Sequence, residues 1–507
     1  MGKAQAQTCA FFVQARTTST RKPEMMKPVI AMLTAAACLA GAAAPKPPTD
    51  VLLFFDTEDY TCDRSNDAIR DIANILTAEN VRGHFMFVGF LAQRLMEYRR
   101  YDVIDSMKGH VIGSQSLYHT LHPDICEMTD VADYKVAHDR ILAQEATCVG
   151  MLRAVFGRDS IDCFVPPGNS VTYAGMAACT DLGMKIYGAA GFADFPVEAD
   201  NPAYGTGGLA RRDNKGKGLW YFNMLQLPYS SKYQLEGRLL PRKGAKPPDY
   251  AEILDGIATH DLTILYMHPH MVVKTRHWDG INYRYENKAP WRKWEEAPDR
   301  PAGDTAIFYE RFRELVRRLK ADARFRLTDI EQIIREIPER RTMHPADIPR
   351  LKASLERKLG PVVEPAPYCV ADVFQAAVKF LGGATAHDPG RVWGFLEKPY
   401  GIEAPVAVKA ADVRAAARRI DLSTFLPSSF DVGGVKIGPA DMLFAMLETL
   451  CGKDEITLSP REQLGTFEEV PTLERFRIND HWCHSKDFRD DYLSDRLRWQ
   501  LWTMYIN

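Results

Sequence analysis

Two stretches of the sequence carry side chains that could bind a metal ion or move protons. The stretch "FDTEDY" holds Asp56, Glu58 and Asp59. The stretch "GSQSLYHTLHP" holds His119 and His122. Carboxylate oxygens and imidazole nitrogens are common ligands of zinc, and the same groups serve as bases and acids in hydrolysis. The residue types therefore indicate metal-assisted hydrolysis, with capped or solvated polar loops as the alternative.

The stretches that carry these residues follow short apolar segments. Asp56 ends "VLLFFD", and His268 follows "LTILYM". The histidine stretch follows "HVIG", and a Pro-Pro-Gly turn follows "DCFV". Active sites of α/β barrels form at the carboxyl ends of the strands. Agreement among four strand ends predicts one shared site more strongly than any single residue does.

The strands that must position this site alternate with helical patterns from about residue 51 to residue 338. The expected strands are 51–56, 84–89, 109–114, 161–168, 184–190 and 262–269, and the expected helices include 67–76, 172–183 and 308–320. Such alternation predicts a parallel sheet or a barrel. Thr328 and Glu331 have the spacing of a capping box, which predicts a helix start there.

In this order the motifs resemble the polysaccharide deacetylase (NodB-homology) family of carbohydrate esterases. The resemblance covers residues 51–338 and rests on motif order, strand placement and spacing. It implies an α/β fold, an irregular (β/α) barrel. It also implies removal of N- or O-acetyl groups from a cell-wall or extracellular polysaccharide, with a divalent metal, zinc, as cofactor.

The resemblance also implies roles for individual residues. Asp56 matches the catalytic base and His268 the general acid. His119 matches a metal histidine. The metal carboxylate falls on either Glu58 or Asp59, because family members place it next to the base or two residues on.

Three positions depart from the family pattern. Gln115 stands where the first metal histidine belongs, and an amide oxygen binds zinc less well than imidazole does. His122 could substitute from the loop, although its spacing differs, or it could contact the substrate. Phe164 stands where an arginine normally orients the base. The third motif therefore matches only in its Pro-Pro-Gly part, where Pro167 and Gly168 are candidates for substrate contact.

The long stretch after His268 is rich in aromatic residues. Trp278 and its aromatic neighbours could stack on sugar rings or could equally be packing residues. A long loop within a barrel domain is more often functional than not. His270 and His277 are expected at the surface rather than as ligands, and His110 is expected to be structural.

Residues 1–49 are predicted to be an N-terminal extension with a signal peptide. An apolar stretch begins at Met26, the expected true start, and ends near Ala44 in an A-x-A pattern. A long basic or disordered tail is the alternative, and a lipoprotein signal through Cys38 is the weaker one. The expected location is the periplasm or the outside of the cell. No later stretch is apolar for long enough to span a membrane.

Residues 350–507 predict a smaller, mainly helical domain. Gly382 is expected to end one helix and Pro439 to begin another. No metal or nucleophile motif occurs there. The domain is expected to be either an accessory, sugar-binding module or a structural one that packs on the barrel.

Composition narrows the functional class. The chain has 507 residues, a formal net charge of −2 and 46% hydrophobic residues. A nucleic-acid-binding protein usually shows a basic excess, so the charge argues against nucleic acid as a partner. The family resemblance implies a polysaccharide instead. No CxxC pair occurs, which argues against a structural zinc site of that kind. The alternatives to a deacetylase are a catalytically lapsed relative that binds carbohydrate and another amide hydrolase on the same barrel.

Overall fold

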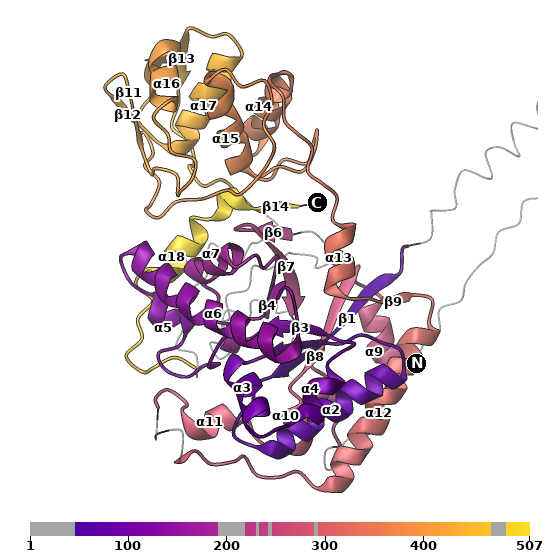
Figure 1. The fold of residues 1–507 in the computed structure, drawn as a ribbon. Helices are drawn as coiled ribbons and strands as arrows, with labels where there is room; N and C mark the ends of the chain where they lie inside the picture. Colours follow the sequence, from indigo (N-terminus) through magenta and orange to yellow (C-terminus); the bar gives the residue numbers. More distant parts are fainter. Residues whose placement is uncertain are drawn as a thin grey trace, which may run out of the picture. The chain divides into compact units, whose positions relative to one another are not determined.

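The computed structural model describes residues 46–190, 219–229, 233–241, 246–287, 290, 293–467 and 483–506. Pro48–Asn507 form one compact unit (Figure 1). The expected signal peptide and the residues before it lie outside the described residues.

A ten-stranded, mostly parallel sheet forms the centre of this unit. Its strands are β1 (Thr49–Thr57), β2 (His84–Phe87), β3 (Val111–Ser114), β4 (Cys163–Phe164), β5 (Ile186–Ala190), β6 (Leu219–Tyr221), β7 (Met224–Tyr229), β8 (Leu262–Met267), β9 (Phe325–Leu327) and β14 (Tyr505–Ile506). Their order is β14-β6-β7-β5-β4-β3-β2-β1-β8, and β9 pairs with the start of β1. The pairs β6–β7 and β14–β6 are antiparallel, and the other strand pairs of this sheet are parallel.

The sheet curls without closing regularly. Among the described residues, the β7 side approaches β8 through an isolated bridge between Gln234 and Tyr266, not through a continuous ladder. A regular barrel would pair every strand on both sides. The structure confirms the predicted α/β fold with an irregular barrel-like sheet.

Helices lie between the strands in sequence, as the alternation predicts. They are α2 (Asp63–Ala78), α3 (Gly89–Glu97), α4 (Tyr101–Ser106), α5 (Ile125–Thr129), α6 (Tyr134–Phe156), α7 (Tyr173–Asp181), α8 (Leu235–Leu239), α9 (Tyr250–Ile257), α10 (His270–Val273), α11 (Trp278–Asn282), α12 (Ala302–Ala321) and α13 (Ile330–Glu336). The expected helices at 67–76 and 308–320 lie within α2 and α12, and the expected helix at 172–183 extends one residue before and two residues beyond α7.

Strand β1 is buried along its whole length, and successive side chains point to opposite faces. Leu53 and Phe55 join the larger core under the helices. Leu52 and Phe54 join a second core that also contains Ile333 of α13. Both faces of the strand are therefore covered, which explains why its sequence is a continuous apolar run.

Helix α13 begins one residue later than the expected capping box. Its N-cap is Asp329, whose carboxylate accepts a hydrogen bond from the Gln332 amide at 2.8 Å. The Thr328 amide is hydrogen bonded to the Val51 carbonyl, so Thr328 still belongs to the strand side of the boundary. Glu331 is bound by Arg82 at 2.9 Å instead of capping the helix.

The region after residue 347 combines helices with two small antiparallel sheets. It contains α14 (Ile348–Arg357), α15 (Val370–Leu381), α16 (Ala410–Ala417) and α17 (Pro439–Leu450), with two small sheets, β10 (Val406–Lys409) with β13 (Glu455–Leu458) and β11 (Phe430–Val432) with β12 (Val435–Ile437). As predicted, α15 ends at Gly382 and α17 begins at Pro439. The left-handed residue after α15 is Gly383, with φ 98°.

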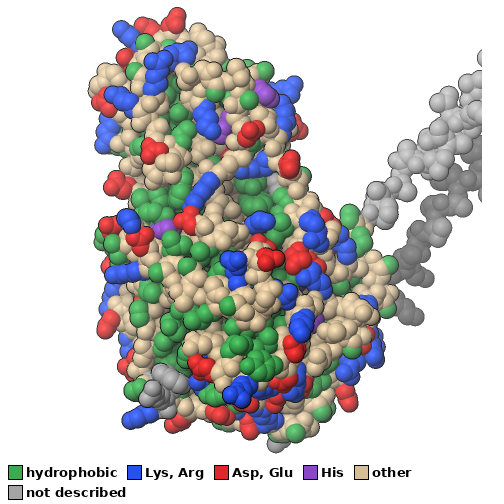
Figure 2. All heavy atoms as spheres, in the orientation of Figure 1, with side chains coloured by type: hydrophobic (Ala, Val, Ile, Leu, Met, Phe, Trp, Pro, Cys, Tyr) green, Lys and Arg blue, Asp and Glu red, His purple; other side chains and the backbone are tan. Residues whose placement is uncertain are grey.

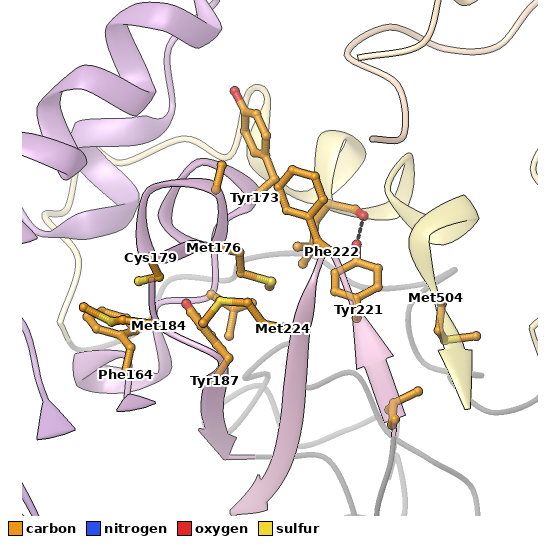
Figure 3. Close-up of a cluster of buried hydrophobic side chains, with 14 of the residues drawn as sticks. Phe164, Tyr173, Met176, Cys179, Met184, Tyr187, Tyr221, Phe222, Met224 and Met504 are labelled. Carbon is orange, nitrogen blue, oxygen red and sulfur yellow. Dashed lines mark hydrogen bonds between the residues drawn. The ribbon is translucent and has the colours of Figure 1, made fainter. Parts of the chain in front are cut away.

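The end of the chain returns to the large sheet. After α18 (Leu493–Arg498), strand β14 pairs with β6. Arg496 donates to the Tyr173 hydroxyl at 2.6 Å, and Met504 lies near Tyr221 in the buried cluster of Figure 3. The terminal segment is thus built into the core of the barrel region.

Charged side chains of both signs are interspersed on the face drawn in Figure 2. Much of this surface charge is paired locally. Arg100, for example, lies within 3.0 Å of carboxylate oxygens of Asp63, Asp67 and Asp102. Exposed pairs of this kind contribute little stability each.

Candidate functional site

Strand register brings Asp56 and His268 together. Phe55 of β1 pairs with Met267 of β8, so the next residue of each chain segment reaches the same edge of the sheet. The His268 Nε2 atom lies 3.6 Å from the Asp56 Oδ2 atom. This is the carboxyl end of the strands, where the sequence places the catalytic pair.

Burial and neighbouring charges raise the pKa values of both Asp56 and His268. Burial raises the pKa of Asp56 to about 7, against the opposing effect of His268. Burial alone would lower the pKa of His268, but the carboxylates of Glu58 and Glu236 outweigh it and raise the pKa to about 10. Asp56 can therefore accept a proton near neutral pH, while His268 holds one to donate.

Glu236 is a site residue that sequence reasoning missed. It lies on the short helix α8, and its Oε1 atom is 2.6 Å from the His268 Nδ1 atom. A carboxylate at that nitrogen fixes the ring orientation and the tautomer. The stretch "YQLEGRL" has no feature that separates this glutamate from a surface residue, so only the fold reveals it.

Glu58 lies at the centre of a group of histidines. His119 Nε2 is 2.8 Å from Glu58 Oε2. The Nδ1 atoms of His270 and His277 lie 3.7 and 3.8 Å from Glu58 Oε1. We call these four residues the Glu58 cluster. Burial alone would raise the pKa of Glu58, but His119 and His268 outweigh it and hold the pKa well below its usual range.

The loop after β3 delivers His119 to this cluster. His119 has a left-handed backbone, with φ 61°. Such a conformation is uncommon for a residue with a side chain and occurs often at functional sites. On its other nitrogen, His119 Nδ1 lies 3.5 Å from Asp279 Oδ2, which supports the ring from behind.

The expectation that His270 and His277 are surface residues is wrong for His270. Its side chain is only 1% exposed, whereas that of His277 is 42% exposed. The chain turns into α10 directly after β8, and this turn carries both rings back to Glu58. Sequence periodicity does not encode the direction of such a turn.

Asp59 and Gln115 have other surroundings. The Asp59 carboxylate accepts hydrogen bonds from Thr61 and from the Ser65 hydroxyl, the latter at 2.6 Å. The Oε1 atom of Gln115 is buried and has no hydrogen-bond partner among the described residues. Of the two candidate carboxylates, Glu58 is the one that contacts His119.

His122 is occupied elsewhere. Its Nδ1 atom lies 3.0 Å from the Glu127 carboxylate, and its Nε2 atom lies 3.0 Å from the Tyr283 carbonyl. Burial alone would lower the pKa of His122, but Glu127 outweighs it and raises the pKa. A protonated ring donates to both acceptors, so His122 connects its loop to Glu127 and to the Tyr283 carbonyl.

Two of the residues expected to touch substrate, Trp278 and Pro167, are buried. Trp278 is fully buried, its ring centroid 5.8 Å from that of His119, which leaves no face for a sugar. Pro167 and Gly168 form a short 3-10 turn, in which a Cβ atom on Gly168 would lie 2.7 Å from Cys483 Sγ. Here the glycine permits close packing of another chain segment.

Phe164 points into the hydrophobic core. Its side chain is 1% exposed, and its ring lies 5.4 Å from that of Tyr187 (Figure 3). An arginine at this position would bury its charge among apolar and aromatic groups, at high cost. The Asp56 carboxylate instead faces the positive charge of His268.

Glu58 and the histidines around it supply carboxylate and imidazole donors, the kinds of ligand that a divalent metal ion binds. Two ligands of a tetrahedral zinc ion lie about 3.3–3.5 Å apart, close to the 3.7 and 3.8 Å separations at Glu58 Oε1. The His270 Nδ1 atom is buried with no hydrogen-bond partner among the described residues, as expected of a nitrogen reserved for an ion. Donor atoms of Glu58, His268 and His277 also lie within 4.8 Å of one another. We assign His268 to proton transfer because Glu236 already binds its Nδ1 atom.

The chain matches no protein-family model and no curated protein. Its structure is similar to that of a protein named as a polysaccharide deacetylase from Mycobacterium smegmatis, with 14% identity, coverage of 58% of this chain and 92% of that chain, and a TM-score of 0.36. It is also similar to a carbohydrate esterase family 4 pseudoenzyme from Bacillus anthracis, with 15% identity, coverage of 45% of this chain and 56% of that chain, and a TM-score of 0.25. A third similar structure is that of a 4-alpha-glucanotransferase from Thermococcus litoralis, with 10% identity, coverage of 57% of this chain and 41% of that chain, and a TM-score of 0.38.

Proposed function

We propose that this protein is a metal-dependent hydrolase that removes N- or O-acetyl groups from a cell-wall or extracellular polysaccharide. One observation carries the proposal. A carboxylate with a pKa near neutrality, Asp56, faces a protonated histidine, His268, beside the metal-binding donor set around Glu58. The resemblance of the motif order to polysaccharide deacetylases supplies the substrate class.

Glu58 and His119 would hold the metal ion, with His270 and His277 completing the set. A bound divalent ion lowers the pKa of a water molecule and polarises the acetyl carbonyl. Asp56 accepts the proton of the attacking water at its carboxylate. His268 donates the proton on Nε2 to the leaving nitrogen or oxygen of the sugar, while Glu236 holds the opposite side of the ring.

The activity is tested by acetate release. Purified protein should be incubated with N-acetylated and O-acetylated glycans after removal of metal and again after zinc addition. We expect acetate release that returns with zinc and is absent from a Glu58→Gln variant, which also loses one equivalent of bound metal. The proposal would be contradicted if the native protein bound no more metal than Glu58→Gln and released no acetate from any of the glycans.

Glu236→Gln should lower kcat by about tenfold to a hundredfold and leave the metal content unchanged. The amide keeps the size of the side chain but removes the charge that raises the pKa of His268. The alkaline limit of the kcat–pH profile should therefore move to lower pH. An unchanged profile would show that Glu236 has only a packing role.

Gln115 favours a second candidate, a catalytically lapsed protein that binds carbohydrate. Its buried amide oxygen stands at the position where the family resemblance places a metal histidine. We expect Gln115→His to change zinc affinity by less than about tenfold, because His270 and His277 already supply imidazole ligands. A rise of more than about a hundredfold, from almost no binding, would instead favour the lapsed protein. Zinc titration with a competing chelator measures the difference.

We further propose that the protein is exported, on the strength of the apolar stretch from Met26 to Ala44. The described residues include no helix long and apolar enough to cross a membrane. Mass spectrometry of the mature N-terminus in the periplasm or medium would test this, and an uncleaved cytoplasmic product would contradict it.

A further inference from the structure

A short piece of the C-terminal segment is inserted between two loops of the candidate active site. The position of a Cβ atom on Gly168 would lie 2.7 Å from Cys483 Sγ and 3.0 Å from Thr120 Cγ2. Cys483 and Thr120, the neighbour of His119, therefore both pack against Gly168 of the Pro-Pro-Gly turn. The adjacent His484 places its Nδ1 atom 2.6 Å from Asp124 Oδ2.

Asp124, Cys483 and His484 bring three different metal-binding atoms together. The carboxylate oxygen, the thiol sulfur and the imidazole nitrogen all lie within 4.8 Å of one another. The three residues are 1%, 1% and 3% exposed. Cys483 Sγ is 3.8 Å from His484 Nδ1. Two ligand atoms on a tetrahedral zinc ion are about 3.3–3.6 Å apart. This spacing lies between the 2.6 Å from His484 Nδ1 to Asp124 Oδ2 and the 3.8 Å from His484 Nδ1 to Cys483 Sγ.

We propose that Asp124, Cys483 and His484 form a second metal site, which binds zinc or a similar divalent ion and fastens the C-terminal segment to the loops of the active site. Sulfur, nitrogen and oxygen donors from three side chains are typical of zinc, with a fourth position left for water. This site is independent of the proposed deacetylase activity, because it shares no residue with the Glu58 cluster.

Binding at this site requires two proton movements. The thiol of Cys483 loses its proton to solvent, since the thiolate is the ligand. At His484 the metal ion takes the Nδ1 position that now faces Asp124 Oδ2 at 2.6 Å, so no proton can remain on that atom. Asp124 and His484 then separate by less than about 1 Å to reach ligand spacing.

The surroundings already hold Asp124 in place for this role. Its Oδ1 atom accepts the Glu127 amide at 3.0 Å, and the Asp124 amide donates to Glu127 Oε2 at 2.8 Å. This capping box of α5 leaves Oδ2 directed at His484. Glu127 also accepts the Ser485 amide, so the segment after the cysteine is fixed at a second point. Fixed outer contacts of this kind orient metal ligands.

Cobalt titration of the metal-free, full-length protein under reducing conditions tests the site. Cobalt bound to a thiolate gives a near-ultraviolet charge-transfer band, and the Glu58 cluster contains no cysteine. The band therefore reports the second site alone. We expect about one equivalent of band-forming cobalt, displaced by zinc, in the native protein and in Glu58→Gln.

Cys483→Ser should abolish the band and remove one equivalent of bound cobalt. Cys451→Ser, which alters an exposed cysteine, is the matched control and should keep the band. Asp124→Asn keeps an N-cap acceptor for α5, so it should fold, and should weaken band-forming cobalt binding by at least about tenfold. A band that is absent from the native protein, or that survives in Cys483→Ser, overturns the second site. Loss of metal in Glu58→Gln with the band intact bears only on the deacetylase site.

Discussion

Asp56→Asn should lower kcat for acetate release by about a hundredfold to ten-thousandfold while leaving bound zinc unchanged. The amide matches the carboxylate in size but cannot accept the proton of the attacking water. Asp56 is not part of the Glu58 cluster, and its carboxylate faces His268 at 3.6 Å. Kinetics with a soluble acetylated oligosaccharide, together with metal analysis of the same preparation, measure both quantities.

Asp59→Asn is the matched control, because Asp59 is equally buried and lies in the same stretch. Its carboxylate is bound by Thr61 and Ser65, so its replacement should change kcat and metal content only a few-fold. The sequence left the metal carboxylate open between Glu58 and Asp59, and Asp59→Asn tests the second of these. If Asp59→Asn lost the metal and Asp56→Asn kept full activity, the assignment of Glu58 and Asp56 would be wrong.

The fold was predictable because local patterns and strand geometry agree. Apolar runs such as residues 51–56 are long enough for buried strands, and helices such as α2 show the periodicity of an amphipathic helix. Parallel strands then place their carboxyl ends at one edge. This is why Asp56 and His268, more than 200 residues apart in sequence, could be paired from motif order alone.

The rest of the site depends on turns that the local sequence does not specify. His270 and His277 reach Glu58 only because the chain folds back through α10. Glu236 reaches His268 from a short helix with an ordinary composition. Single-residue expectations based on a loop position therefore underestimated the number of histidines in the site.

The C-terminal segment was the least predictable part. The sequence predicted a helical domain over residues 350–507, either an accessory module or one that packs on the barrel. It gave no sign that β14 joins the large sheet or that Cys483 packs against Gly168. Contacts between residues over 300 positions apart have no local signature. Gly168 illustrates the consequence, since its sequence context indicates a turn at the site but its small size is needed for the approach of Cys483.

The buried carboxyl group of Glu145, next to Ser114 at the end of β3, makes a prediction about how stability depends on pH. Glu145 of α6 is completely buried, and its Oε2 atom accepts a hydrogen bond from the Ser114 hydroxyl at 3.0 Å. Burial raises the pKa of Glu145 to about 8. The folded protein thus keeps a proton on this group at neutral pH, while the unfolded chain loses it above a pH of about 4.5.

Glu145→Gln should therefore make the protein more stable at alkaline pH and leave it nearly unchanged at acidic pH. Between pH about 4.5 and about 8, the folded state binds more protons at this position than the unfolded state, so native stability falls as pH rises. The full effect is about 3–5 kcal/mol, at ~1.4 kcal/mol per pH unit. The glutamine is neutral throughout and can keep the Ser114 hydrogen bond, so this contribution disappears. Urea unfolding of both proteins at pH 5 and pH 8 measures the difference, because other titrating groups cancel in the comparison. Asp139→Asn, an exposed change on the same helix, should show no comparable gain at pH 8, and an equal pH dependence in Glu145→Gln and the native protein would mean that Glu145 is ionised in the fold.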